Sequence, residues 1–210
     1  PVSLDVHPGE IVGLTGQLGS GASAVVRSLA GMLSPLAGRA LLDGDELSLR
    51  SRATTLKRGV AYCTADRKRD GIFAVRSIRE NLSSPWVRSV SPGGWISGRR
   101  ERQRTKEIAA QFAIDVKRLA IAVSALSGGN QQKVAVGKWL GAQPRVILLE
   151  EPTRGVDIGA RAEIYQRLRD LCGAGVGIVI ASSDTSEILG LSDTIATFYR
   201  RRMTRIMSHV

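Results

Sequence analysis

The stretch Leu-Ser-Gly-Gly-Asn-Gln-Gln-Lys at residues 126–133 has the residue types needed to bind phosphate. A serine is followed by two glycines, and the missing side chains leave backbone N–H groups open to a close anion. Residues 131–140 contain few helix breakers and place Val134 and Val136 on an apolar stripe, so the glycines should begin a helix. Unpaired amides and the helix dipole favour an anion at such an end. A surface loop before a helix has the same pattern, so the rest of the chain must decide.

A second glycine-rich segment, residues 16–23, follows a short apolar stretch at residues 11–14. A strand, a glycine-rich loop and a helix in this order are the setting of a phosphate-binding P-loop. The motif requires a lysine before Ser23, but Ala22 stands there instead. Backbone amides and the Ser23 hydroxyl remain suited to phosphate and Mg²⁺, while the loss of the charged bond should cost about 1.5–3 kcal/mol of binding.

The apolar run at residues 146–149 ends in two carboxylates, Glu150 and Glu151. Nearly continuous apolar residues are typical of a central strand in a parallel sheet. Because ligands bind at the carboxyl ends of strands in open α/β sheets, the glycine loop and both carboxylates should share one site.

Periodicity predicts the elements that position these residues. Strands are expected at residues 2–6, 11–14, 39–42, 60–63, 146–149, 177–181, 194–199 and 203–207. Helices are expected from the glycine loop to about residue 33 and at residues 48–58, 99–112 and 158–172. Ile108 and Phe112 should anchor the third of these helices.

Taken together, these motifs resemble those of ABC-transporter ATPases. Residues 126–133 resemble their signature motif, and the Asn-Gln-Gln-Lys ending resembles the carbohydrate-importer branch, whose ATPase chain carries two ABC domains in tandem. The details resemble the second domain of a ribose, galactose or xylose importer. Further matching segments follow in the family's order over nearly the whole chain, at residues 65–71, 80–82, 151–157 and 182–193.

The resemblance implies a single ABC nucleotide-binding domain over residues 1–210, excised from a longer tandem chain. We expect an α/β fold whose three-layer P-loop NTPase-type core, with a mostly parallel sheet and an antiparallel β part, comprises residues 1–74 and 134–210. An inserted α-helical subdomain at residues 75–133 should end in the signature motif and contact a membrane permease. Trp86 and Trp95 in this insertion are either interface anchors or ordinary core residues.

The resemblance also implies the site residues. Mg²⁺ is expected at Ser23 and Glu150, whereas Glu151 holds the position of the general base and Ser183 that of a switch histidine. Asp157 has a second interpretation, as the N-cap of the helix that follows it. The expected ATP contacts are Gly16, Gly19, Ser20, Gly21, Ala22, Ser23, Ala24, Ser127, Gly128, Gly129, Asn130 and Asp157.

The chain's own site departs from the family pattern at Ala22, Ala65, Glu150 and Ser183. Ala65 cannot bind a ligand, and Asp66 beside it is either a substitute ligand or an ion-pair partner of Arg67. Glu150 is one methylene longer than the family's Asp, and Mg²⁺ tolerates misplaced ligands badly. Serine cannot bridge as an imidazole does. These losses beside an intact signature predict a degenerate site of its own and a signature that completes a partner's ATP site.

Composition bounds the class of protein. A chain of 210 residues with 43% hydrophobic and 4% aromatic residues suits an α/β domain built on aliphatic strands, and no apolar run reaches the length of a membrane span. The net charge of +11 would suit a nucleic-acid binder, but the basic clusters carry no regularly interleaved aromatics. Solvated faces near nucleotide phosphate or anionic lipid headgroups are favoured. Cys63 and Cys172 lack metal-ligand spacing and should be reduced.

The expected partners are a second ABC domain, membrane permease subunits and, indirectly, a periplasmic or extracellular sugar-binding protein, with no nucleic acid. The chain would then lie in the cytoplasm at the inner face of the cell membrane. Two other hypotheses stay open: a soluble ABC-type protein that acts on nucleic acid, and a structural pseudo-ATPase that holds the permease without nucleotide.

Overall fold

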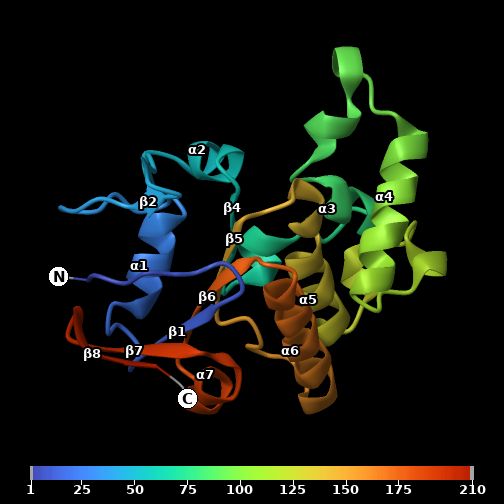
Figure 1. The fold of residues 1–210 in the computed structure, drawn as a ribbon. Coiled ribbons are helices and arrows are strands. Elements are labelled where there is room, and N and C mark those ends of the chain that lie inside the picture. The colour runs from blue at the N-terminus through green and yellow to red at the C-terminus, as the bar shows by residue number, and fades with distance from the viewer. Residues whose placement is uncertain (1, 209–210) are drawn as a thin grey trace. The chain divides into compact units, whose positions relative to one another are not determined.

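The structure is a computed structural model that describes residues 2–208 (Figure 1). The chain forms two compact units. Unit 1 comprises Pro1–Tyr62, Pro144–Pro152 and Leu168–Val210, and unit 2 comprises Cys63–Gln143 and Thr153–Arg167. The predicted fold class, α/β with a mostly parallel sheet and an antiparallel part, is confirmed.

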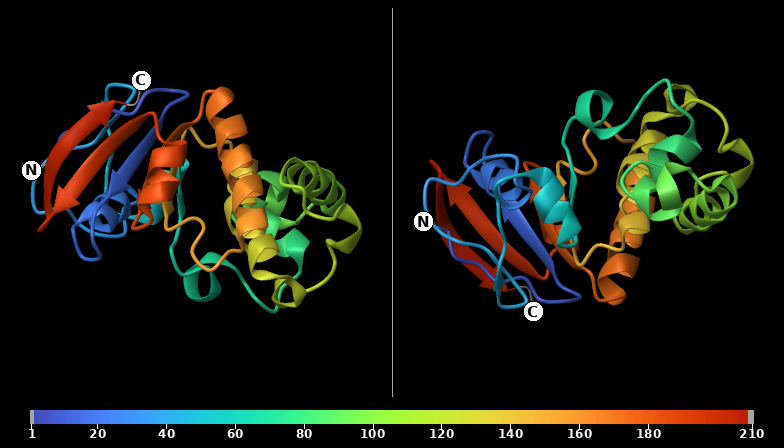
Figure 2. Two further views of the ribbon diagram at one scale, coloured as in Figure 1. Left: turned by 90° about the horizontal axis from the view of Figure 1, so that it is seen from below. Right: turned by 90° about the horizontal axis from the view of Figure 1, so that it is seen from above.

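The main sheet has six strands in the order β4-β5-β6-β1-β7-β8. β1 pairs in parallel with β6 and β7, and β5 pairs in parallel with β6, whereas β8 is antiparallel to β7 and lies at one edge (Figure 2). Because β1, β5 and β6 run the same way, Thr15, Glu150 and Ser182 meet at one edge of the sheet. The strands are β1 Ile11–Thr15, β4 Val60–Cys63, β5 Val146–Glu150, β6 Gly177–Ser182, β7 Thr194–Tyr199 and β8 Arg202–Ser208.

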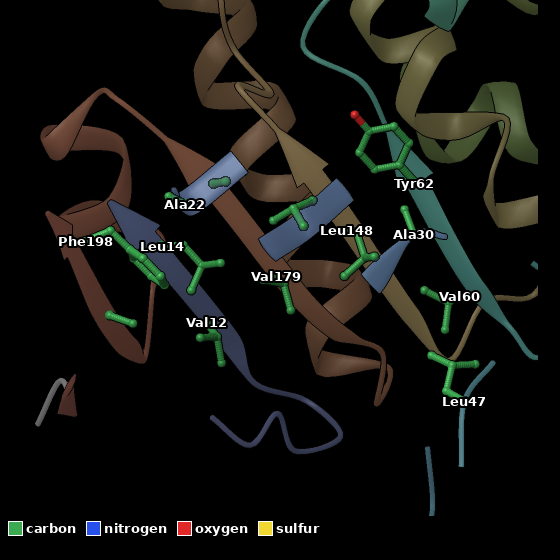
Figure 3. Packing of buried hydrophobic residues seen from close by; sticks show 13 residues of the cluster. Val12, Leu14, Ala22, Ala30, Leu47, Val60, Tyr62, Leu148, Val179 and Phe198 are labelled. Atoms are coloured by element: carbon green, nitrogen blue, oxygen red, sulfur yellow. The ribbon is translucent and has the colours of Figure 1, made fainter. Parts of the chain in front are cut away.

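Helices cover both faces of this sheet. Successive side chains of a strand point to opposite faces. Val12 packs in a buried cluster with α1, whereas a Cβ added at Gly13 would lie 2.7 Å from Cγ2 of Ile188 in α7. Leu148 and Val179, paired on β5 and β6, belong to the α1 cluster (Figure 3). The smaller elements of unit 1 are α1 Ala22–Leu29, β2 Leu41–Leu42, β3 Asp45–Glu46, α2 Arg52–Lys57 and α7 Thr185–Leu191.

Unit 2 is mainly helical, and the predicted helix at residues 99–112 corresponds closely to α4, which spans Gly98–Gln111. Ile108 and Phe112 are 4% and 1% exposed, which confirms them as anchors. Trp86 is buried and therefore a core residue, whereas Trp95 is exposed. Within the described residues, every helix is too short or too polar to span a bilayer. The helices are η1 Arg67–Gly71, α3 Ile78–Ser83, η2 Val87–Val90, η3 Pro92–Gly94, α4 Gly98–Gln111, η4 Val116–Arg118, η5 Val123–Ala125, α5 Gly128–Gly137, η6 Leu140–Ala142 and α6 Ile158–Gly173, whose last residues belong to unit 1.

Two predicted helices of unit 1 are shorter than expected. α1 ends at Leu29 rather than near residue 33, because Gly31 takes a φ of +70° and packs its backbone against Ser51, where a Cβ would lie 2.6 Å from the Ser51 carbonyl. α2 begins only after Ser51, whose hydroxyl accepts the N–H of Thr54 as an N-cap. Ser51 therefore packs against the residues that follow α1 and also caps the start of α2.

The strand predicted at residues 2–6 is wrong. These residues pair with no strand in the described part of the chain. Both sides of β1, the strand that follows them in sequence, are already occupied by β6 and β7. Alternation of apolar and polar residues indicates a half-buried segment, but a strand also needs a free neighbouring edge. Asp43 and Gly44 both have positive φ and form the turn that joins β2 to β3.

A core substitution and a surface substitution of the same type test the packing of unit 1. Leu148 is 1% exposed, whereas Leu36 is fully exposed. Leu148→Ala should lower the free energy of unfolding by about 2–5 kcal/mol, because it removes buried methyl groups and leaves a cavity. Leu36→Ala should change it by less than about 0.5 kcal/mol. Urea denaturation measures both, and equal effects would contradict the position of β5 in the core.

Two helical glycines provide a second test. A Cβ at Gly129 in α5 would lie 2.5 Å from Cβ of Ala160, whereas a Cβ at Gly190 in α7 meets nothing within 4 Å. Gly129→Ala should destabilise the fold by about 1–3 kcal/mol through overpacking. Gly190→Ala should stabilise it by about 0.5–1 kcal/mol, because alanine is the better helix former. Thermal unfolding should show shifts of opposite sign; stabilisation by Gly129→Ala would contradict the close approach.

Candidate functional site

Residues 16–21 connect β1 to α1, and several positions of this loop favour glycine. Gly19 and Gly21 have φ values of +81° and +111°. A Cβ at Gly16 would lie 2.4 Å from the carbonyl oxygen of Phe198. The carbonyl of Ser20 accepts the N–H of Arg201 at 2.7 Å, so the turn between β7 and β8 supports the loop. The loop is therefore a rigid backbone cradle.

The start of α1 leaves backbone donors available to an anion. No side chain caps this helix at Gly21, so its first N–H groups lack a side-chain acceptor. Ser23 is half-buried in the first turn, and Ala24 beside it is exposed. Ala22 is 6% exposed and packs in the apolar cluster, so it can offer only its backbone amide. The site keeps the geometry of an anion cradle and lacks a lysine charge.

Glu150 forms an ion pair that the sequence did not predict. Arg27 donates from Nε to Oε2 at 2.9 Å and from Nη2 to Oε1 at 2.7 Å, and the Tyr62 hydroxyl donates to Oε2 at 2.6 Å. Glu150 is 3% exposed, so its charge requires this compensation. The hydrogen bonds from Arg27 to Glu150 raise the pKa of the guanidinium above its ordinary value. The carboxylate is therefore neutralised from within the protein.

The surroundings of Glu150 do not fit a magnesium ligand. Mg²⁺ requires oxygen ligands in near-ideal octahedral geometry. Both oxygens of Glu150 already accept hydrogen bonds, and a cation, Arg27, occupies the face that carries them. Without Glu150, the Ser23 hydroxyl would offer Mg²⁺ one uncharged oxygen ligand. The metal roles predicted for Ser23 and Glu150 therefore remain predictions that no contact supports.

Glu151 and Ser183 are brought together at the ends of β5 and β6. The backbone N–H of Ser183 donates to Oε1 of Glu151 at 2.9 Å, and the Ser182 hydroxyl lies 3.4 Å from Oε2. Glu151 has a φ of +48°, a conformation that costs free energy in a non-glycine residue and is found often at functional sites. Ser183 contributes its backbone to this contact. The catalytic roles of both residues remain predictions.

The signature segment starts α5, as predicted. Ser127 is exposed and is the N-cap, and its Oγ accepts from the side chain of Asn130 at 3.1 Å. A Cβ at Gly128 would lie 2.9 Å from Nη2 of Arg67 and 3.2 Å from the carbonyl oxygen of Gly155, so the backbone is closely approached at this position. Gly129 is buried against Ala160, so this glycine also permits two helices to pack. The sequence prediction explained the glycines by phosphate access alone and missed this packing role.

Asp157 and Arg67 surround the signature within unit 2. Asp157 accepts the N–H of Ala160 at 2.9 Å, so its N-cap interpretation is confirmed. Its Oδ2 would also lie 3.3 Å from a Cβ at Gly129. Arg67 donates to the carbonyl oxygens of Arg154 and Gly155 at 2.7 and 3.2 Å. The guanidinium of Arg67 thus binds the loop at residues 153–157 and lies beside Gly128 at the start of α5.

Asp66 caps η1, and no ion pair joins it to Arg67 among the described residues, so its predicted role as a substitute ligand stays a prediction. Its side chain accepts the N–H of Arg69 at 3.1 Å and caps η1. Arg67 beside it makes its hydrogen bonds to the loop at residues 153–157 instead. A capping carboxylate is held by the backbone. The cap therefore gives Asp66 a structural role.

The motif at residues 80–82 is also structural. Glu80 and Ser77 form a capping box at the start of α3, and hydrogen bonds from the Ser77 backbone and hydroxyl hold the pKa of Glu80 below its ordinary value. Asn81 is fully buried and bonds the backbone of Phe73 through both its oxygen and its nitrogen. Leu82 is fully buried. This motif anchors the loop before α3.

The residues that sequence reasoning missed are Arg27, Tyr62, Arg67 and Arg201. One signal was available for Arg27, since it follows Ser23 by one helical turn and so lies on the same face of α1. Tyr62 and Glu150 are far apart in sequence, and nothing in the sequence indicates their contact. Both cysteines are free thiols: Cys63 is buried, and partial burial raises the pKa of the Cys172 thiol.

Comparison with known proteins gives consistent relatives. The family model described as ABC transporter matches residues 1–154. The chain is 40% identical over 204 residues to the ribose import ATP-binding protein RbsA 2 of Agrobacterium fabrum. This alignment covers 97% of this chain and 40% of that protein. The chain is 41% identical over 204 residues to the arabinose import ATP-binding protein AraG 2 of Burkholderia thailandensis, with 97% and 39% covered. The chain thus spans about two fifths of the length of these relatives.

Solved structures support the fold. A nucleotide-free ATP-binding cassette from an ABC transporter superposes with a TM-score of 0.85 at 20% identity, covering 99% of this chain and 83% of the other. A dimeric ATP-binding cassette in a post-hydrolysis state, bound to ADP and Pi, superposes with a TM-score of 0.82 at 22% identity, covering 98% and 88%. At such identities the likeness shows the fold alone. Because the family model matches well over half of its residues, this chain belongs to the ABC transporter family.

Proposed function

We propose that this chain is an ATP-binding domain of a sugar ABC importer whose own glycine-loop site is degenerate. Its signature segment completes the ATP site of a partner ABC domain. ATP hydrolysis, with Mg²⁺, takes place at that partner's glycine loop. The proposal separates two sites: the cradle at residues 16–23, and the start of α5, which serves another domain's nucleotide.

The relatives favour transport of a sugar. They are named as ribose and arabinose import ATP-binding proteins. The chain spans about two fifths of their length, which leaves room for a second ABC domain in the same polypeptide. One solved cassette of the same fold is described as a dimer with ADP and Pi. A pair of ABC domains is therefore the assembly that we propose.

The observation that carries the proposal is the construction of the signature segment. Ser127 is exposed, so its hydroxyl can bind a group outside this domain. The first amides of α5 follow it, and the positive end of the helix dipole adds to their attraction for phosphate. Arg67 lies against Gly128 and adds positive charge at the same place. Such donors stabilise charge that develops on a phosphate during hydrolysis.

The chain's own site lacks the parts that hydrolysis requires. Ala22 supplies no charge to the phosphates, and Arg27 neutralises Glu150. Glu151 is held by the backbone of Ser183, where an imidazole would be needed to bridge base and phosphate. A general base is effective only beside a well-positioned water and phosphate. The site is therefore suited to hold nucleotide weakly.

The remaining partners follow from this assignment. We propose that the helical part of the chain contacts permease subunits, and that a sugar-binding protein outside the membrane delivers the sugar to them. Trp95 and Ile96, just before α4, are 85% and 55% exposed, as suits residues of a protein interface. The chain would thus lie at the inner face of the membrane through the permease.

The two other hypotheses are less well supported. For action on nucleic acid, the basic charge is the only feature in favour, and the relatives are named for import. For a structural pseudo-ATPase, the losses at residues 22, 65, 150 and 183 count in favour. The preserved cradle and the uncapped start of α1 count against it, because a domain without nucleotide needs neither.

Substitutions in the full-length protein, assembled with its permease, distinguish the two sites. Ser127→Ala should lower steady-state ATPase activity about tenfold or more, because it removes a hydrogen bond to charged phosphate. Glu151→Gln should change the activity by less than about twofold, because the base it removes belongs to a disabled site. Ser127 is a better probe than Gly129, since any side chain at Gly129 also breaks the packing on Ala160.

A matched control removes the effect of helix capping. Ser77 caps α3 as Ser127 caps α5, so Ser77→Ala removes a helix cap of the same type at a residue outside the signature segment. Its ATPase activity should stay near that of the unaltered protein. If Glu151→Gln reduces the activity as much as Ser127→Ala, the site at residues 16–23 hydrolyses ATP and the proposal is wrong.

A further inference from the structure

The ion pair between Arg27 and Glu150 lies at the place where a metal was predicted. Glu150 is the last residue of β5, at the sheet edge that also carries the glycine loop. The guanidinium meets it through two parallel hydrogen bonds of 2.7 and 2.9 Å, and the Tyr62 hydroxyl bonds one of the same oxygens at 2.6 Å. Bidentate pairs of this type are the strongest ion pairs that side chains form.

The helix geometry brings Arg27 to the phosphate side of α1. Side chains of a helix point back toward its N-terminus and cover the preceding turn. Arg27 follows Ser23 by one turn, so the two residues lie on the same face of α1, and we expect the long side chain of Arg27 to reach back toward the first amides. The glycine cradle ends at this same start, at Gly21. The charge of Arg27 is therefore directed to the cradle.

Arg27 also keeps a free donor face. A guanidinium carries five N–H donors. Nε and Nη2 bind Glu150, and Nη1 forms no hydrogen bond with any residue from 2 to 208. The side chain is 50% exposed, so this third nitrogen can reach a ligand. Arg27 can thus donate to a phosphate oxygen while it still holds Glu150.

Binding of a magnesium ion to Glu150 would be unfavourable. Binding to Glu150 would require it to displace a bidentate partner from a carboxylate that is 3% exposed. The displaced Arg27 would then stand beside a divalent cation of like charge, which is unfavourable at short range. Breaking a buried pair is costly in itself. The built-in cation and the metal therefore compete for one carboxylate.

We propose that the site at residues 16–23 binds a nucleoside triphosphate or diphosphate without a divalent cation, and that the Arg27 guanidinium, held by Glu150 and Tyr62, supplies the positive charge that magnesium would otherwise supply. The inference rests on the proposed function only in taking the glycine loop as a nucleotide site. Glu150 offsets part of the charge of Arg27, so we expect a modest affinity that comes from the loop amides, the helix end and the exposed Nη1 of Arg27.

Titration of the 210-residue chain with a fluorescent ATP analogue, mant-ATP, tests the inference. The dissociation constant is measured in excess Mg²⁺ and again in excess EDTA, with folding checked by circular dichroism. The two values should agree within about twofold for the unaltered chain. In Arg27→Met the affinity in EDTA should fall about tenfold or more, because a charged hydrogen bond is lost. Mg²⁺ should then strengthen binding, because Glu150 is freed.

Two further variants make the result independent of folding and of general charge. Arg39→Met removes an arginine of the same type from the surface of unit 1 and should leave both dissociation constants nearly unchanged. Glu150→Gln keeps Arg27 and removes its charged partner, so it should leave the affinity in EDTA unchanged or higher. This variant does not bury an unpaired charge, and it stays informative if Arg27→Met fails to fold.

Three outcomes would overturn the inference. One is a dissociation constant of the unaltered chain for mant-ATP that is about tenfold or more lower in Mg²⁺ than in EDTA. Another is a loss of magnesium-supported binding in Glu150→Gln, which would make Glu150 a metal ligand. The third is no binding in either condition, which would favour the structural pseudo-ATPase. None of the three affects the role of Ser127 at a partner's site, which ATPase assays of the assembled transporter measure separately.

Discussion

The parallel pairing of β5, β6 and β1 is the constraint on which the chemistry of this chain depends. Parallel strands end at one edge, so the glycine loop after β1, the two glutamates at the end of β5 and Ser183 after β6 become neighbours although they are far apart in sequence. β7 continues the same pairing, and its turn into β8 holds the carbonyl of Ser20. The same sheet therefore positions the glycine loop after β1 and holds it through the turn between β7 and β8.

Burial then decides the charges at this edge. Glu150 ends a central strand and is almost completely buried, so a negative charge there needs a cation and hydrogen-bond donors beside it. Arg27 and Tyr62 meet this demand with three hydrogen bonds. Glu151, the next residue, turns away through a left-handed conformation and bonds the end of β6. Two adjacent carboxylates therefore have different partners.

Much of the fold and part of the site could be predicted from the sequence. Continuous apolar runs predicted the core strands, because a strand buried on both faces of a sheet is apolar at nearly every position. The strand predicted at residues 2–6 was wrong because alternation of apolar and polar residues does not show whether a neighbouring strand has an unpaired side. The contact of Arg27 with Glu150 joins residues distant in sequence, and the glycine at position 129 is required by Ala160, so neither could be read from local pattern. Resemblance predicted which residues share a site, whereas packing determined what each of them contacts.

The central claim is that ATP is hydrolysed at a partner's glycine loop with Ser127 of this chain facing it, and not at residues 16–23. The most direct test is vanadate trapping of photoreactive azido-ATP in the assembled transporter with Mg²⁺, followed by mapping of the labelled peptides. The account predicts label on the partner's glycine loop, with peptides of residues 16–24 at background. Label on residues 16–24 that depends on vanadate would contradict it.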